Sequence, residues 1–155
     1  MNQEQIKQVT RIDLIRELIE DCKYDDALEQ LDLLQTDEPD NYEVYYEFAR
    51  IYFEFGDYNS AIENYEILLE YHRSAIMYYN LALAYEANDE IDKAISNYLK
   101  CLSLNEKFPF AHKKLGVLFL ARGDKQDAKE YFANYINLDI PQSEKEEIGA
   151  LLKRI

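Results

Sequence analysis

Histidine and cysteine, the residues best suited to metal binding and nucleophilic chemistry, are scarce in this sequence and widely spaced. The histidines stand at positions 72 and 112, and the cysteines at positions 22 and 101. Zinc sites usually combine such ligands at short, regular spacings. The sequence also lacks a glycine-rich phosphate loop, an HExxH motif and a calcium-binding loop. We therefore expect no catalytic residue, no metal site and no cofactor.

The charge of the chain limits the class of partner. There are 31 acidic and 17 basic residues, and the net charge is −14. A surface that binds DNA or RNA phosphates needs clustered Lys and Arg, so we expect no nucleic-acid partner. Residues 1–74 carry 19 acidic and 6 basic side chains, whereas residues 75–155 carry 12 and 11. The acidic half is either a solvated face or a docking surface for a basic partner.

The composition indicates which elements position these side chains. The chain is 48% hydrophobic but has only 4 Gly and 3 Pro, which favours helices over a turn-rich β fold. No apolar stretch approaches the roughly 20 residues that span a bilayer, so we expect no membrane insertion. The polar start, residues 1–8, lacks the apolar core of an export signal, and we predict a cytoplasmic location.

A repeat runs through the chain. Ala27, Ala61, Ala94 and Ala128 are spaced by 34, 33 and 34 residues, and a large apolar residue follows each alanine four positions later. These large residues are Leu31, Tyr65, Tyr98 and Phe132. A second cluster recurs upstream: Leu14, Ile15 and Leu18; Phe48, Ala49 and Tyr52; Leu81, Ala82 and Tyr85; Leu115, Gly116 and Phe119. A period in this range is typical of stacked helical repeats.

Each repeat contains two amphipathic stretches of about 14 residues with helical periodicity. A short turn joins them, at residues 22–24, 56–58, 89–91 and 123–125. Small residues in both stretches predict close helix crossings, and the large residues fill the space around them. Cys101 stands at a packing position, so we interpret it as a buried small hydrophobic residue. His112 also stands at a packing position, and we interpret both histidines as structural or solvated side chains.

This pattern resembles the tetratricopeptide repeat family. The resemblance implies an all-α, right-handed α-solenoid of four helix-turn-helix units at residues 8–41, 42–74, 75–108 and 109–142, forming a single domain over residues 1–155. The copies at 42–74 and 75–108 match best, and the copy at 8–41 is the weakest, with Arg11 where a large or aromatic residue is usual.

The two ends of the chain have their own patterns. Residues 3–21 predict one long first helix, and residues 143–155 predict a capping helix that covers the last repeat. Ser143 and Glu146 have the spacing of a capping box. The apolar stripe of the capping helix consists of Ile148, Leu151, Leu152 and Ile155.

The resemblance also implies where a partner binds. In this family, defined positions of each first helix line a concave groove, and their apolar members here are not needed within the repeat. We predict a peptide-binding groove with Tyr46, Phe53, Tyr79 and Phe110 as apolar anchors and Arg50, Asn80, Lys113 and Lys114 as polar contacts. The carboxylate clamp of some family members matches poorly, because only Asn80 is identical among its five positions.

We interpret the chain as a non-catalytic scaffold or adaptor that binds a peptide segment of a protein partner. Two alternatives remain open at the level of sequence. One is a dedicated chaperone for a secretion or assembly client, and the other is a self-assembling structural module that forms a homo-oligomer. The client of a chaperone should become insoluble or be degraded without this chain, whereas the partners of an adaptor should remain folded. A self-assembling module should change its oligomeric state with concentration.

Overall fold

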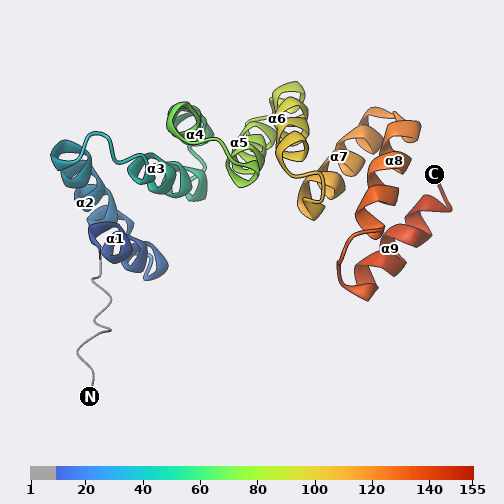
Figure 1. Cartoon of the computed structure of the whole chain (residues 1–155), viewed down its shortest axis with the longest axis horizontal. Coiled ribbons are helices and arrows are strands. Elements are labelled where there is room, and N and C mark those ends of the chain that lie inside the picture. Colours follow the sequence, from blue (N-terminus) through green and yellow to red (C-terminus); the bar gives the residue numbers. More distant parts are fainter. Residues whose placement is uncertain (1–9) are drawn as a thin grey trace, which may run out of the picture. The chain divides into compact units, whose positions relative to one another are not determined.

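The computed structural model describes residues 10–155, which form helices and no strands (Figure 1). Within these residues the helices are α1 (Arg11–Glu20), α2 (Tyr24–Asp37), α3 (Glu43–Glu54), α4 (Tyr58–Tyr71), α5 (Ala75–Ala87), α6 (Ile91–Leu104), α7 (Pro109–Arg122), α8 (Lys125–Ile136) and α9 (Gln142–Leu152). Successive pairs form hairpins, each within one predicted repeat. The predicted all-α fold of tandem helical hairpins is therefore confirmed.

The chain divides into two compact units between His72 and Arg73. The first unit contains α1 to α4, and the second contains α5 to α9. Each is described by itself below. The prediction of a single domain over residues 1–155 stays a prediction.

The repeated alanines lie where each pair of helices crosses. Ala27, Ala61, Ala94 and Ala128 have no exposed surface. The large residues that follow them are buried as well, with Tyr98 and Phe132 fully enclosed. A methyl group at the crossing lets two backbones approach closely, and the neighbouring large side chains then fill the interior. The predicted alternation of small and large residues is thus the packing rule of each hairpin.

Gly116 on α7 marks the tightest of these crossings. A Cβ atom built at this position would lie 2.6 Å from two ring carbons of Phe132, which is fully buried on α8. No ordinary carbon contact is that short. Glycine is therefore required for the observed approach of α7 to α8.

The turn inside each hairpin has one residue with left-handed backbone geometry. Gly56 and Gly123 have φ angles of 77° and 85°. The equivalent residues in the other two turns are Cys22 and Asp89, with φ angles of 58° and 61°. Side chains with a Cβ are strained in this region, whereas glycine is not. All four hairpins therefore use the same turn, but the backbone is strained at Cys22 and Asp89 and unstrained at the two glycines.

Helix α9 lies against α8 in the second unit (Figure 1). Ile148 is buried, and Leu151, Leu152 and Ile155 pack onto the cluster that contains Phe132. The predicted capping box is wrong, because α9 begins at Gln142 after an N-cap at Pro141, with no capping hydrogen bond from a side chain. Ser143 therefore lies inside the first turn of the helix.

The first helix differs from its prediction in two ways. It begins at Arg11 with Thr10 as the N-cap, and Thr10 and Asp13 form a capping box. The predicted helical residues before position 10 lie outside the described residues. Leu14, predicted to pack inside the hairpin, is instead 51% exposed, and the core of the first hairpin uses Ile12, Ile15 and Ile19.

Candidate functional site

The predicted groove residues of the first unit all lie on α3. Tyr46 packs edge-on against Tyr65, with 6.3 Å between ring centroids, and the Arg50 guanidinium lies 5.8 Å from the Tyr46 centroid. Phe53 makes a similar edge contact with Tyr58 at 5.4 Å. The three side chains are half-buried. Tyr46 and Arg50 therefore form one local group, while Phe53 packs on the start of α4.

Glu47, next to Tyr46 on α3, is a buried carboxylate held by two arginines. Arg16 Nε of α1 donates to Glu47 Oε1 at 2.6 Å, and an Arg50 terminal nitrogen donates to Oε2 at 2.7 Å. Arg16 also donates to Glu43 at 2.8 Å. The Glu47 side chain has no exposed surface. The Arg50 guanidinium therefore already pairs with an acid of its own helix.

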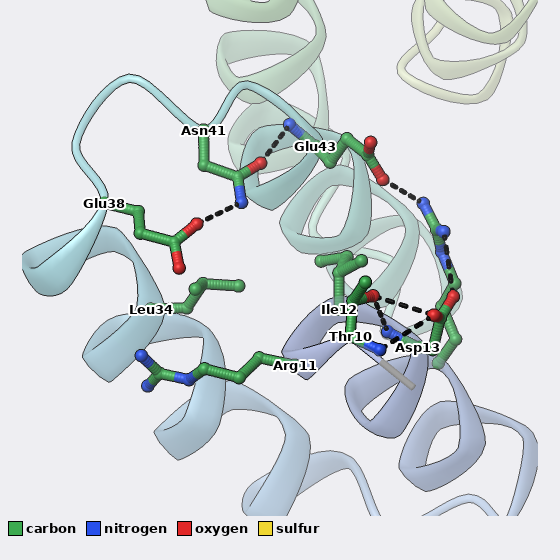
Figure 2. A pocket seen from close by; sticks show the side chains of 9 residues that line it. Thr10, Arg11, Ile12, Asp13, Leu34, Glu38, Asn41 and Glu43 are labelled. Carbon is green, nitrogen blue, oxygen red and sulfur yellow. Dashed lines mark hydrogen bonds and ion pairs between the residues drawn. The ribbon is translucent and has the colours of Figure 1, made fainter. Parts of the chain in front are cut away.

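A pocket of ≈440 Å³ lies beside this network (Figure 2). Ile12 and Leu34, from the core of the first hairpin, form its apolar part. Asn41 donates to Glu38 at 2.9 Å, and its side-chain oxygen accepts from the backbone N–H of Glu43, as Figure 2 shows. Both lining arginines pair with acids of the same unit. The pocket wall therefore offers no unpaired arginine to an anion.

The second unit brings four aromatic rings together. The Tyr79 centroid on α5 lies 5.6 Å from that of Tyr98, 5.1 Å from that of Phe108 and 6.2 Å from that of Phe110. Phe108 and Phe110 also contact each other at 6.3 Å. We call Tyr79, Phe108 and Phe110 the aromatic surface. Phe110 is its outermost member, because its residue is 58% exposed while the other two are half-buried.

Phe108 was not predicted as a site residue. It lies in the loop just before Pro109 and acts as the N-cap of α7, outside the first-helix positions from which the groove was read. Its only sequence signal is the run Phe108-Pro109-Phe110, in which two rings flank a helix-starting proline.

Both predicted lysines are paired with acids of neighbouring helices. Lys114 Nζ donates to Glu86 Oε1 at 2.9 Å, and Glu86 Oε2 accepts from the Tyr98 hydroxyl at 2.6 Å. Lys113 Nζ donates to Glu144 of α9 at 2.7 Å. The last predicted polar residue, Asn80, is half-buried on α5. The cations beside the aromatic surface are thus neutralised within the unit.

The protonation of these groups follows from their surroundings. Burial, together with the nearby Glu86 carboxylate, raises the pKa values of Tyr79 and Tyr98 above the ordinary tyrosine value. Burial and the hydrogen bond to Glu144 raise the pKa of Tyr135 to about 12. Hydrogen bonds from Lys113 and Tyr135 lower the pKa of Glu144. At neutral pH the tyrosines are therefore donors and Glu144 is an anion.

Cys101 is buried as predicted, and His112 is buried as well. His112 Nε2 donates to the carbonyl oxygen of Glu106 at 2.8 Å, and Nδ1 is a buried atom with no partner among the described residues. Burial raises the pKa of the Cys101 thiol to about 11, which disfavours the nucleophilic thiolate. Within residues 10–155 no three His, Cys, Asp or Glu side chains are grouped so that they could hold a metal ion.

None of the helices formed by residues 10–155 has the length and apolar character needed to cross a membrane.

Tandem hairpins with small residues at every crossing define a helical-repeat protein. Family models described as tetratricopeptide repeat match residues 46–103 and residues 114–139. Together these ranges cover more than half of the chain. The chain belongs to the tetratricopeptide repeat family, a family whose repeats serve protein–protein interaction.

One curated relative is the photosystem I assembly protein Ycf3 of Prochlorococcus marinus, which is 39% identical over 72 residues. The match covers 44% of this chain and 42% of the relative. The chain thus matches about two fifths of the length of this relative.

Solved structures show the same fold at low identity. MamA has a TM-score of 0.80 at 23% identity, and the match covers 92% of this chain and 84% of MamA. YrrB, described as a TPR protein with an unusual peptide-binding site, has a TM-score of 0.77 at 17% identity, with 93% and 75% coverage. These similarities establish the fold alone.

Proposed function

We propose that this chain is a non-catalytic adaptor that binds an apolar segment of a partner protein on the aromatic surface of the second unit. The observation that carries the proposal is the exposed Phe110 ring, which is held beside Tyr79 and Phe108. Aromatic anchors fixed by their neighbours lose little conformational entropy on binding, and such residues dominate protein interfaces.

The charges around the aromatic surface favour an uncharged segment over an acidic tail. Lys113 and Lys114 each lie within hydrogen-bonding distance of a glutamate. A partner carboxylate would have to break one of these pairs before it gained a cation, and it would meet Glu86 or Glu144 nearby. An apolar segment covers the rings without that cost.

In the first unit, Tyr46, Arg50 and Phe53 form a smaller candidate surface. Arg50 pairs with Glu47 and lies near the Tyr46 ring. This surface therefore also presents apolar groups to a partner and no unpaired cation. We propose it as a secondary contact for the same class of partner. The single groove that the sequence predicts across repeats remains a prediction.

Site-specific cross-linking tests the proposal. A photoreactive phenylalanine analogue placed at position 110 should cross-link a partner in native cell extract, and the partner is then identified by mass spectrometry. The same analogue at position 104 is the control, because Leu104 is 54% exposed in the same unit but lies at the end of α6. Equal yields of one product from both positions would reject the aromatic surface as the binding site.

A second candidate function is a dedicated assembly chaperone. It is favoured by the similarity to proteins named as photosystem I assembly proteins. A client bound by a chaperone should aggregate or be degraded when the chain is absent, whereas the partner of an adaptor should stay folded. Solubility of the cross-linked partner with and without this chain separates the two. The predicted cytoplasmic location and homo-oligomer stay predictions.

A further inference from the structure

A second surface, on the first repeat, breaks the burial pattern of the others. Position 7 of the repeats is occupied by Leu14, Phe48, Leu81 and Leu115. Phe48, Leu81 and Leu115 are 6%, 3% and 0% exposed, but Leu14 is 51% exposed. The leucine of the first repeat is therefore uncovered at a position that is buried in the other three repeats. This exposes apolar surface of the kind that marks an interaction site.

Leu14 and Leu18 form the apolar part of a pocket of ≈460 Å³ between α1 and α2. Its other lining residues include Glu17, Asp21, Asp26 and Glu29. The one lining cation, Lys23, pairs with Asp21 at 2.7 Å, and both members of that pair are exposed. Such a surface pair is weak and opens at little cost. The pocket thus combines two leucines with a rim of acidic residues.

The second unit shows what covers the equivalent face of another repeat. There α6, the second helix of the preceding hairpin, packs on α7, which carries the buried Leu115. An ion pair joins the two helices, because Arg122 at the end of α7 donates to Asp92 near the start of α6. In the first repeat, the residue at the position of Arg122 is Asp21. At this position the charge is therefore the reverse of that on α7.

We infer that the face formed by Leu14 and Leu18 docks a basic amphipathic helix of a partner protein. The leucines accept the apolar stripe of the helix, and the acidic rim pairs with its Lys and Arg side chains. Complementary charge argues against a second copy, since the whole chain carries a net charge of −14. This site shares no residue with the aromatic surface, so an experiment can reject either proposal and leave the other standing.

The test is a binding titration with a fluorescein-labelled peptide of roughly 18 residues, with leucines at i, i+4, i+7 and i+11 and lysines on the other face. One control peptide has the same composition in scrambled order, and another has glutamate in place of lysine. Leu14→Gln should weaken binding about tenfold or more. Leu33→Gln is the matched control, because Leu33 is 48% exposed on α2 but does not line the pocket.

Four results would overturn the inference. Equal binding of the scrambled peptide would mean attraction by charge alone, and equal loss in both leucine variants would mean that Leu14 is not specific. Self-association of the full chain that Leu14→Gln abolishes would assign the face to a second copy. If the full chain binds the peptide only after Ile6→Gln and Val9→Gln, the face would be assigned to the chain's own first residues. Phe110→Ser should bind the labelled peptide as the wild type does, because Phe110 belongs to the aromatic surface.

Discussion

Glu47 changes how the charges on α3 are understood. In the sequence it stands between Tyr46 and Arg50, two predicted groove residues. In the structure its carboxylate is fully buried, with one oxygen bound by Arg16 and the other by Arg50. A carboxylate satisfied in this way holds α1 against α3 instead of facing a ligand.

Arg16→Met tests this role. The change leaves buried Glu47 with one arginine instead of two, so we expect the free energy of unfolding to fall by about 1–3 kcal/mol in chemical denaturation. Arg11→Met is the control, because Arg11 pairs with Asp37 at 2.7 Å on the surface and should contribute less than about 1 kcal/mol. Equal losses in the two variants would argue against a special role for the buried carboxylate.

Gly116→Ala tests the tight crossing of α7 and α8. Alanine favours a helix over glycine by up to about 1 kcal/mol, but its methyl group would overlap the enclosed Phe132 ring. We expect overpacking to prevail and to destabilise the protein by about 1–3 kcal/mol. Gly149→Ala on α9, where no atom lies within 4 Å of the new methyl, should instead stabilise it. A higher melting temperature for both variants would contradict the packing.

At the residue level, steric features were predictable and polar partners were not. Ala27 and Ala94 could be recognised because close backbone approach excludes larger side chains at their position in every repeat. Gly116 could be recognised because its position is small in three of the four repeats. The pairing of Lys114 with Glu86 joins residues 28 positions apart on different helices. No sequence periodicity identifies which of many acids a flexible lysine reaches. Lys113 and Lys114 were therefore predicted as ligand contacts without their own partners.

The four hairpin turns allow a test at the level of one element. Cys22 has the same left-handed backbone geometry as Gly56 but carries a Cβ. Cys22→Gly should therefore stabilise the protein by up to about 1 kcal/mol. The reverse change, Gly56→Ala, meets no neighbouring atom, so any loss of stability would come from the backbone alone. A stabilising Gly56→Ala would contradict this explanation of the turns.

Helix α9 is attached to the last hairpin by apolar packing and by Glu144. The Glu144 carboxylate accepts hydrogen bonds from Lys113 and Tyr135, which lower its pKa. A lowered folded-state pKa means that the stabilisation is present above about pH 4.5 and is lost as the pH falls through the folded-state value. Acid should therefore loosen α9 from α8.

Thermal melts between pH 6 and pH 3 test this attachment. The wild-type melting temperature should fall more over this range than that of Glu144→Gln, because only the wild type loses the carboxylate. Glu147→Gln, an exposed neighbour on α9, should fall as the wild type does. The idea fails if Glu144→Gln and wild type have parallel profiles.

For whole elements, the sequence was informative where the pattern repeats and less so at the ends. Hairpins were placed by a period that recurs four times. The capping box at Ser143 was wrong because the helix already begins at Gln142 after Pro141, and Glu146 accepts a hydrogen bond from the Gln142 side chain instead. The prediction for Leu14 was wrong because no hairpin precedes α1 among residues 10–155, whereas α3 and α7 each pack on the second helix of the preceding hairpin.

The division into two units coincides with the division of charge. Residues 1–72 hold 19 of the 31 acidic side chains, and the pocket formed by Leu14 and Leu18 lies among them. The aromatic surface belongs to the second unit, where acidic and basic side chains are equal in number. We therefore expect the two units to select partners of different chemistry, a basic helix and an uncharged apolar segment.

The binding of the cross-linked partner to purified variants tests the central claim most directly. Isothermal titration should show that Phe110→Ser weakens binding about tenfold or more, because the exposed anchor is lost while the fold is kept. Leu104→Ser should bind like the wild type, and circular dichroism should show all three proteins equally helical. Wild-type affinity in Phe110→Ser would contradict the assignment of the aromatic surface as the binding site.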